Sequence, residues 1–322
     1  MKTLEHWLLS VWYGHKPLAQ LALLPLTALY CLISCMKQWL DTRKQVAQPV
    51  PVIVVGNITV GGTGKTPVVI WLVQQLQALG LTVGVISRGY GGKAGVATVT
   101  VTANSDPQSV GDEPVLIVQR THVPLVVGRQ RNLAIQRLLA DTVCDVIISD
   151  DGLQHYAMAR ALEIVVVDGQ RQFGNGYCLP AGALREPLSR LASVDFVLTN
   201  GQNLQVQGDT LINLRSGNPL KLSAFMGQTV HVVTGIGNPQ RFINSLQAAG
   251  LTVIAHIYPD HHAFNGTELQ LKPDLPILMT EKDAVKCRAF AAEHCWYLPI
   301  TAHIEADLAQ RLLTRIRDLV HG

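Results

Sequence analysis

The sequence predicts an α/β fold in which a largely parallel sheet is covered by helices on both faces. Short, continuous runs of valine and isoleucine alternate with helical stretches between residues 51 and 198. Continuous apolar runs, rather than alternating ones, are typical of parallel strands that are buried on both faces. A glycine-rich turn also joins the first run to the first helical stretch. Strands that alternate with helices in this way form a doubly wound sheet.

The elements of this sheet are expected in a regular order. Buried strands are predicted at 51–55, 83–86, 125–127, 146–148, 164–167 and 196–198, with a further short strand at 97–101. Helices are predicted at 67–79, 113–120 and 131–140. Together they define a predicted domain over residues 46–222.

A second, smaller α/β domain is predicted for residues 223–322. The stretch 201–225 is polar and contains several glycines, so it interrupts the preceding pattern. A new series then begins with a strand at 230–233, a Gly235-Ile236-Gly237 turn and a helix to about residue 249. We expect it to continue with strands near 253–256 and 277–279 and a closing helix at 308–320.

The composition excludes several classes of protein. Of the 322 residues, 48% are hydrophobic and 15% are charged, which excludes a disordered chain. The net charge of +3 does not favour a nucleic-acid-binding protein. The six cysteines form no CxxC pair, so neither a disulfide framework nor a zinc site is indicated, and reduced thiols are expected.

Residues 1–45 have the character of a membrane-associating segment. They carry five of the 26 basic groups and two of the 23 acidic ones, so the remaining chain has 21 of each. Residues 17–36 contain no charge, and as a helix these 20 residues would be about 30 Å long, which matches the hydrocarbon core of a bilayer. Pro25 is expected to kink or break that helix.

Aromatic residues flank the uncharged run, as they often do at membrane interfaces. They are Trp7, Trp12, Tyr13, Tyr30 and Trp39. Three arrangements remain open from the sequence: a helix that anchors in one leaflet, a single membrane span, and a helical hairpin packed on the protein. Membrane contact is favoured, because basic residues strengthen attraction to an anionic leaflet.

A phosphate-binding loop is predicted between the first strand and the first helix. The nucleotide-binding residues would be Thr59, Val60, Gly61, Gly62, Thr63, Gly64, Lys65 and Thr66. Glycines allow backbone N–H groups to surround phosphate oxygens, the lysine supplies positive charge, and the threonine hydroxyl binds Mg²⁺. Thr59 stands where the usual motif begins with glycine. The fold class is therefore a P-loop NTPase-type parallel sheet.

Two adjacent carboxylates follow the strand at 146–148. Asp150 and Asp151 would lie at the same sheet edge as the phosphate loop, where ligands of such folds collect. Mg²⁺ typically takes one or two carboxylates and keeps several waters. We therefore expect this pair, with Thr66, in the environment of a magnesium ion.

Three further motifs have more than one interpretation. Asp112 precedes a predicted helix, where an aspartate is commonly an N-cap. Asp260-His261-His262 could bind a metal or pair a histidine with a carboxylate for proton transfer. The arginines and tyrosine after two strands could bind an anionic substrate or lie in solvated loops: Arg88, Tyr90, Arg129 and Arg131.

Several motifs, taken together and in this order, closely resemble the tetraacyldisaccharide 4′-kinase family, the lipid A 4′-kinases of Gram-negative bacteria. They are GNITVGGTGKTP (56–67), SRGYGG (87–92), VGDEP (110–114), DDGLQH (150–155), LPAGALREP (179–187), PDHH (259–262) and TEKDAVK (280–286). The resemblance covers nearly the whole chain and is more specific than the phosphate loop alone.

The resemblance implies ATP-dependent phosphorylation of the 4′-hydroxyl of a tetraacylated disaccharide 1-phosphate, in a cleft between the two domains. By this similarity, Asp112 would be the general base and His261 its partner. Glu113 would join Asp150 and Asp151 around Mg²⁺. The lipid headgroup would meet Arg88, Tyr90, Arg129 and His155. The enzyme would act at the cytoplasmic face of the inner membrane, with membrane lipid and the lipid A precursor as partners, and without a nucleic-acid or protein partner.

The main alternative is a membrane-associated P-loop GTPase or ATPase that switches a partner. A GTPase would be expected to carry an NKxD segment after a late strand. Thr199-Asn200-Gly201-Gln202 lacks the lysine and the aspartate, and the spacing in Thr280-Glu281-Lys282-Asp283 does not fit. A soluble kinase or ligase for a small metabolite is a third possibility, and the apolar segment 17–36 argues against it.

Overall fold

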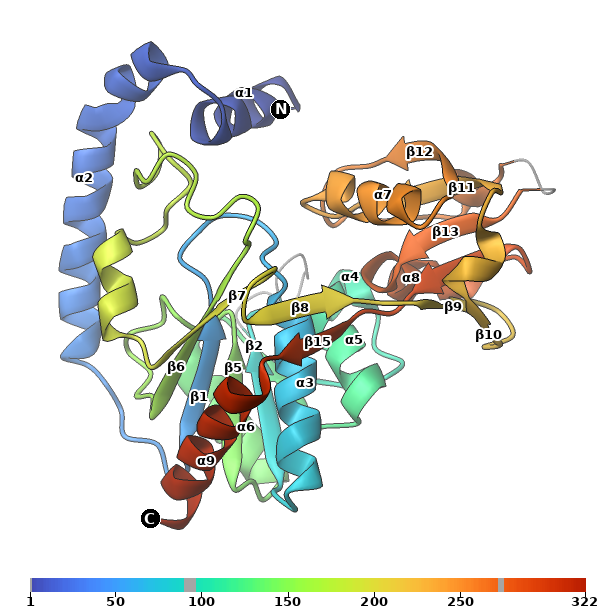
Figure 1. Ribbon diagram of the computed structural model, residues 1–322. Coiled ribbons are helices and arrows are strands. Elements are labelled where there is room, and N and C mark those ends of the chain that lie inside the picture. The colour runs from blue at the N-terminus through green and yellow to red at the C-terminus, as the bar shows by residue number, and fades with distance from the viewer. Residues whose placement is uncertain (1, 90–96, 272–274) are drawn as a thin grey trace.

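The computed structural model describes residues 2–89, 97–271 and 275–322. Figure 1 shows a larger α/β body, a smaller one beside it, and two N-terminal helices along the larger body. Tyr90 lies outside the described residues, so its predicted role stays a prediction.

The larger body contains a seven-stranded sheet with the order β3-β4-β2-β5-β1-β6-β7. Every neighbouring pair is parallel except β3 and β4. The strands are β1 (Val52–Gly56), β2 (Val83–Ser87), β3 (Val99–Val101), β4 (Leu125–Val127), β5 (Val146–Asp150), β6 (Leu162–Val167) and β7 (Phe196–Thr199). The predicted parallel sheet is confirmed.

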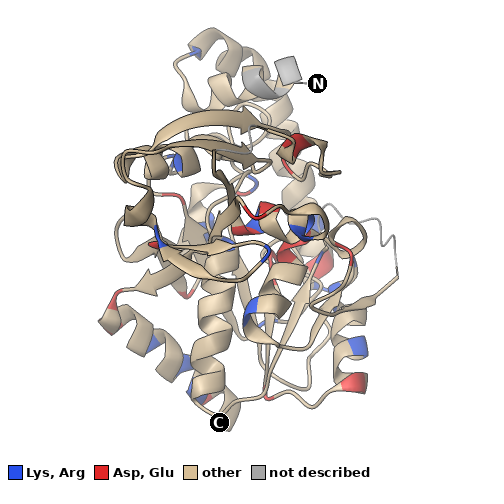
Figure 2. Ribbon diagram, turned by 90° about the vertical axis from the view of Figure 1, so that its right-hand side faces the viewer, with Lys and Arg blue, Asp and Glu red and all other residues tan. Residues whose placement is uncertain are grey.

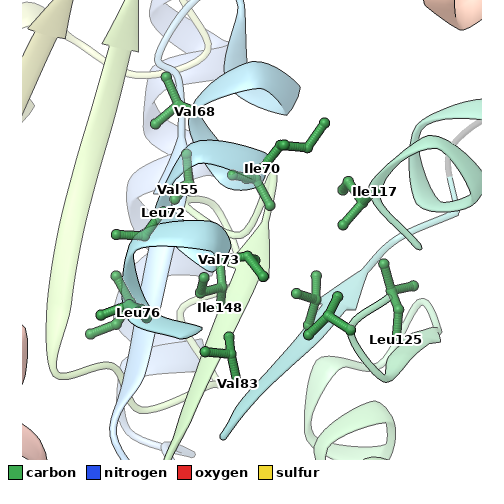
Figure 3. Close-up of a cluster of buried hydrophobic side chains, with 14 of the residues drawn as sticks. Val55, Val68, Ile70, Leu72, Val73, Leu76, Val83, Ile117, Leu125 and Ile148 are labelled. Carbon is green, nitrogen blue, oxygen red and sulfur yellow. The ribbon is translucent and has the colours of Figure 1, made fainter. Parts of the chain in front are cut away.

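Helices cover both faces of this sheet, as predicted. One face packs against α3 (Lys65–Ala78), α5 (Asp112–Thr121) and α9 (Ala306–His321). Figure 3 shows side chains of α3, including Leu72 and Leu76, beside Val55 and Ile148 of the sheet. The other face packs against α6 (Arg131–Asp141) and part of α2 (Pro17–Thr42). The short helices α4 (Pro107–Val110) and η1 (Leu188–Ser193) lie in connections.

The smaller body is built on a six-stranded sheet with the order β10-β9-β14-β13-β11-β12. Its strands are β9 (Thr210–Asn213), β10 (Pro219–Lys221), β11 (Thr229–Thr234), β12 (Thr252–Ile257), β13 (Ile277–Thr280) and β14 (Cys295–Leu298). Its helices are α7 (Pro239–Ala248), α8 (Glu281–Cys287), η2 (Leu222–Phe225), η3 (Thr267–Leu269) and η4 (Arg288–Phe290). A separate antiparallel pair, β8 (Leu204–Gln207) with β15 (Thr301–Ile304), joins the two bodies.

The closing helix differs from the prediction, because it packs on the larger body. Leu312 and Ile316 of α9 are fully buried in the same core as α3. The pairing of β15 with β8 returns the chain to the larger domain, so the apolar stripe of α9 reaches that core. The smaller sheet also takes β9 and β10, which precede the expected boundary at residues 222 and 223. These strands are short and lie at one edge of the sheet, so they lack the long apolar runs on which the prediction depends.

The N-terminal helices are α1 (Lys2–Tyr13) and α2, and Figure 1 shows α2 lying along the larger body. The helix α2 continues through Pro25, so the break that was one of the two expected effects does not occur. Among the described residues, α2 is the one helix long and apolar enough to cross a membrane. Its exposed large apolar side chains are Leu18, Leu21, Leu26, Leu29, Leu32, Ile33, Met36, Trp39 and Leu40.

Three of the aromatic residues near the uncharged run contact the rest of the protein. The indole of Trp12 is 8% exposed and donates to the carbonyl of Pro180 at 2.9 Å. Tyr30 donates its hydroxyl proton to the carbonyl of Arg185 at 2.9 Å, and the Tyr13 ring lies under the Arg171 guanidinium. Trp12 is therefore buried in the protein, which corrects its expected interfacial role, whereas Trp7 and Trp39 are exposed.

Candidate active site

The phosphate loop links β1 to α3, as predicted. Gly61 and Gly64 have φ values of 112° and 94°, a region in which side-chain-bearing residues are strained, so the loop requires glycine there. The amide of Asn57 donates to the carbonyl of Thr59 at 2.8 Å, and its oxygen accepts from Lys65 Nζ at 3.2 Å. The loop and its lysine are thus held by one side chain at the end of β1.

Asp151 holds the lysine of the phosphate loop. Its Oδ1 atom lies 3.3 Å from Lys65 Nζ and 3.4 Å from Nη1 of Arg185. Burial favours the neutral acid, but the charges of Lys65 and Arg185 prevail and lower the pKa of Asp151 to about 2. Asp151 is therefore an ionised carboxylate committed to two cations.

Asp150 has a different environment, because the chain turns sharply after it, with Asp151 at a φ of 48°. The Asp150 side chain is 1% exposed, and its Oδ2 accepts from the Ser87 hydroxyl at 3.1 Å. Its Oδ1 is buried and has no hydrogen-bond partner among the described residues. Burial, together with the charges of Glu113 and Asp151, raises the pKa of Asp150 to about 7.

These residues fit a magnesium ion. A buried carboxylate oxygen without a hydrogen-bond partner is a suitable cation ligand, and Asp150 Oδ1 is such an atom among the described residues. Thr66 lies in the first turn of α3, directly after Lys65. Within residues 2–89, 97–271 and 275–322, no cluster of three or more histidine, cysteine or acidic side chains could hold a metal by itself. Mg²⁺ at phosphate sites typically uses few protein ligands and completes its shell with phosphates and water.

Asp112 and His261 meet at the boundary between the two bodies. Asp112 is the first residue of α5 and is 4% exposed. Its Oδ1 accepts from the N–H of Glu113 at 2.9 Å, and its Oδ2 lies 3.2 Å from Nδ1 of His261. The helix is preceded by Gly111, so Asp112 is not the N-cap residue. The carboxylate points to the smaller domain instead.

The two groups have opposite pKa shifts. Burial alone would raise the pKa of Asp112, but the charges of Lys282, His261 and Lys286 hold it well below its usual value. Burial lowers the pKa of His261, but the hydrogen bond and the charge of Asp112 outweigh burial and raise it. The imidazole is therefore the more basic member of the pair.

The neighbouring histidine faces another direction, so the double histidine does not form one site. Nε2 of His262 lies 2.8 Å from Oε1 of Glu268, and its ring stacks on Tyr258 with the centroids 4.7 Å apart. Of the two interpretations of Asp260-His261-His262, the structure supports a histidine paired with a carboxylate.

The structure places the predicted headgroup residues unevenly. His155 lies after β5, and burial together with the charges of Arg131 and Arg88 lowers its pKa to about 3. Arg88 follows β2 and is exposed. Arg129 is also exposed, whereas Arg131 is buried and donates to the carbonyl of Asp150 at 3.2 Å. Arg131 thus supports the turn that carries the two aspartates.

Several residues at the site were missed as site residues by the sequence reasoning. Lys282 of α8 lies 2.7 Å from Oε1 of Glu113, so Glu113 pairs with a cation rather than standing free beside Asp150. Arg185 binds Asp151, and Lys286 approaches Asp112. The motifs TEKDAVK and LPAGALREP contain these residues and were the available signal. Figure 2 shows acidic and basic residues gathered where the two bodies meet.

Comparisons with known proteins give similarities over nearly the whole chain. A family profile described as tetraacyldisaccharide-1-P 4′-kinase matches residues 19–317. The chain is 51% identical to the tetraacyldisaccharide 4′-kinase of Methylobacillus flagellatus, over 99% of this chain and 98% of that protein. It is 50% identical to that of Pseudomonas aeruginosa strain LESB58, over 92% of each chain.

A solved structure shows the same fold. The crystal structure of LpxK from Aquifex aeolicus in complex with ATP superposes with a TM-score of 0.80 at 26% identity. The match covers 94% of this chain and 99% of that one. The phosphate loop, the paired Asp112 and His261 and these similarities lead to one conclusion: the chain belongs to the tetraacyldisaccharide 4′-kinase family.

Proposed function

We propose that the protein transfers the γ-phosphoryl group of ATP to the 4′-hydroxyl of a tetraacyldisaccharide 1-phosphate, a step of lipid A biosynthesis. The observation that carries the proposal is the contact between Asp112 and His261 at the domain boundary. A phosphate loop alone is compatible with hydrolysis, but a buried carboxylate–histidine pair beside it suits removal of a proton from a sugar hydroxyl. The family relationship names the substrate class.

In this proposal the loop 59–66 binds the ATP phosphates through its backbone N–H groups and Lys65. Asn57 and Asp151 keep the Lys65 ammonium in place. Asp150 and Thr66 would hold Mg²⁺, which when bound neutralises phosphate charge. Glu113 would belong to the environment of the same ion, because its charge acts on Asp150. Lys282 compensates the charge of Glu113.

The Asp112–His261 pair accepts the proton of the 4′-hydroxyl. Because the pKa of Asp112 is lowered and that of His261 is raised, the proton comes to reside on the imidazole. The pair is formed by two domains, so it is complete only when they are in contact. Such an arrangement would limit transfer of the phosphoryl group to water.

The lipid headgroup would lie beside the two aspartates, near His155 and Arg88. With its pKa at about 3, His155 is neutral at pH 7 and acts as a hydrogen-bonding group rather than a cation. Arg88 and Arg129 are exposed and carry the charge available to an anionic headgroup. Tyr90 keeps its place in this proposal from the family resemblance alone.

We propose that α2 anchors the protein in one leaflet at the cytoplasmic face of the inner membrane. One side of α2 exposes leucines, and the other is bonded to the protein. The hydroxyl of Thr27 accepts from the N–H of Ala181 at 3.1 Å, and Tyr30 donates to the carbonyl of Arg185. A transmembrane position would remove these partners, so the contacts favour the anchor over a span.

The test is transfer from labelled ATP to the disaccharide 1-phosphate lipid in detergent micelles with Mg²⁺. A reaction without lipid and the Lys65→Ala variant serve as controls. Label at the 4′ position that disappears in the variant supports the kinase. Lipid-independent hydrolysis of ATP or GTP without labelled lipid would instead support the membrane-associated switch.

A further inference from the structure

Asp283 and Lys286 form a buried ion pair on α8, next to the Asp112–His261 contact. Nζ of Lys286 lies 2.9 Å from Oδ1 of Asp283 and 3.8 Å from Oδ2 of Asp112. The side chain of Asp283 is fully buried and that of Lys286 is 8% exposed. The ammonium group also lies 4.9 Å from the ring centre of Phe264. Burying a charge is costly unless it is compensated, and here carboxylates of both domains compensate it.

Asp283 also binds the backbone that positions His261. Its Oδ1 accepts from the N–H of Gly235 at 3.2 Å, and its Oδ2 accepts from the hydroxyls of Thr234 and Thr280 at 2.9 and 2.7 Å. The carbonyl of Gly235 accepts in turn from the N–H of His261 at 3.1 Å. The Asp283 carboxylate therefore fixes the backbone just after β11, and the His261 loop is hydrogen-bonded to this backbone.

These contacts form a closed ring of five residues. It runs from Asp112 to Lys286, Asp283, Gly235 and His261, and back to Asp112. His261 has a φ of 57°, a sparsely populated conformation that persists only where its surroundings hold it. The ring holds His261 in this conformation at two points: Asp112 contacts its side chain, and Gly235 accepts a hydrogen bond from its backbone N–H.

We propose that Lys286 and Asp283 are positioning residues for phosphoryl transfer, which hold Asp112 and His261 in register across the domain boundary. The inference rests on the proposed kinase function. Lys286 fixes the Asp112 carboxylate from the smaller domain, and Asp283 fixes the backbone of His261. Neither side chain needs to touch ATP or lipid.

A purely structural role is the competing explanation, and the chain offers a matched control for it. Arg120 of α5 and Glu281 of α8 form another ion pair between the same two helices, at 2.9 Å. Among the described residues, this pair forms no hydrogen bond or ion pair with Asp112 or Gly235. Arg120→Gln therefore removes a contact between the domains and leaves the ring intact.

The experiment compares Lys286→Met, Lys286→Arg and Arg120→Gln in the lipid phosphorylation assay, with thermal unfolding measured for each. We expect Lys286→Met to lower kcat about 10- to 100-fold, as a misplacement near 1 Å does, with the KM for ATP within about 3-fold of wild type. Lys286→Arg should restore most of the loss, and Arg120→Gln should keep kcat near that of wild type. If Lys286→Met does not fold, Lys286→Gln takes its place, with the same expected changes in kcat and in the KM for ATP.

A double-mutant cycle with Asp112→Asn decides whether Lys286 acts through Asp112. We expect Lys286→Met to change the residual rate of Asp112→Asn less than about 2-fold, because residues that act as a unit are not additive. Equal losses in Lys286→Met and Arg120→Gln, or independent losses in the cycle, would overturn the inference. Absence of lipid phosphorylation by the wild-type protein would refute the proposed function instead.

Discussion

Nδ1 of His261 lies 3.2 Å from Oδ2 of Asp112, although 149 residues separate them along the chain. One residue begins a helix of the larger domain, and the other lies in a loop of the smaller one. The contact therefore depends on how the domains are placed, and its chemistry depends on both side chains. Five predictions concern this site and the surface of α2.

Asp112→Asn should lose most phosphoryl transfer while ATP binding persists. The amide can neither take part in the proton transfer nor raise the pKa of His261 as the carboxylate does, and general-base catalysis typically contributes about 10²- to 10⁴-fold. His261→Ala should cause a loss of similar size, and the double variant should be little worse than either. Steady-state rates and ATP titrations measure both effects. His262→Gln is the matched control, because this histidine pairs with Glu268, and turnover should stay near that of wild type.

Lys65→Ala should lower transfer by about 10²- to 10³-fold, the usual cost of removing one preorganised charge from a transition state. Asp151→Asn should have a smaller effect of the same kind, since it releases the ammonium without removing it. Asp141→Asn breaks an exposed ion pair with Arg137 on α6 and is the control. Comparable rates for Asp151→Asn and Asp141→Asn would show that Asp151 does not position the lysine.

Without metal, the stability that Asp150 contributes should be lost as the pH rises toward 7, while the lowered pKa of His155 changes stability in the opposite direction. The unfolded chain ionises Asp150 near its ordinary pKa, whereas the folded protein keeps the proton up to about pH 7. Between these values Asp150 binds more protons in the folded state than in the unfolded state, so its contribution to the free energy of unfolding falls with rising pH. Asp150→Asn should remove this fall. Denaturant unfolding at pH 5, 6 and 7 in a chelator measures it, and an unchanged slope in the variant would contradict the assignment.

The divalent cation should counteract this loss of stability at neutral pH, because it takes the place of the proton on Asp150. Adding Mn²⁺ as a probe should raise the unfolding midpoint more at pH 7.5 than at pH 5.5. The Asp150→Asn variant should show little gain at either pH.

Charges on the outer side of α2 should release the protein from membranes without unfolding it. Leu29 and Leu32 are 52% and 66% exposed. Burying a leucine contributes about 1.5–3 kcal/mol, so Leu29→Glu with Leu32→Glu should weaken vesicle binding at least about 10-fold. Flotation with anionic vesicles measures binding, and an ATP titration checks the fold. Val143→Glu adds a charge at an exposed apolar position outside α2, and it should bind vesicles like wild type.

Deleting residues 1–45 is a less specific test of the same idea. Val11 and Trp12 are buried against the segment that contains Ala183, whose carbonyl accepts from Val60 N–H in the phosphate loop at 2.8 Å. The deletion would therefore also disturb the nucleotide site. Lost activity in such a variant does not distinguish membrane contact from support of the phosphate loop.

The buried strands could be predicted because their apolar runs are local features of the chain. The strand at 125–127 was predicted with its observed bounds, and β1, β2 and β5 within one or two residues. The strands β8, β9, β10, β14 and β15 were not predicted, since each has only three or four residues and no continuous run of valine or isoleucine. The sequence also does not show that α9 packs on the larger body, because the pattern of an amphipathic helix does not specify against which core its apolar side packs.

The sequence by itself determined the parallel sheet, the phosphate loop and the aspartates that end β5, because each depends on residues adjacent in the chain. The family resemblance added the roles of Asp112 and His261. Only the tertiary structure decided that Asp112 faces His261 rather than capping its helix, and that His262 turns to Glu268. It also decided which of the two neighbouring aspartates binds Lys65. Distances across domains and the charge around a buried group arise only when the chain is folded, and these set both the contacts and the pKa values.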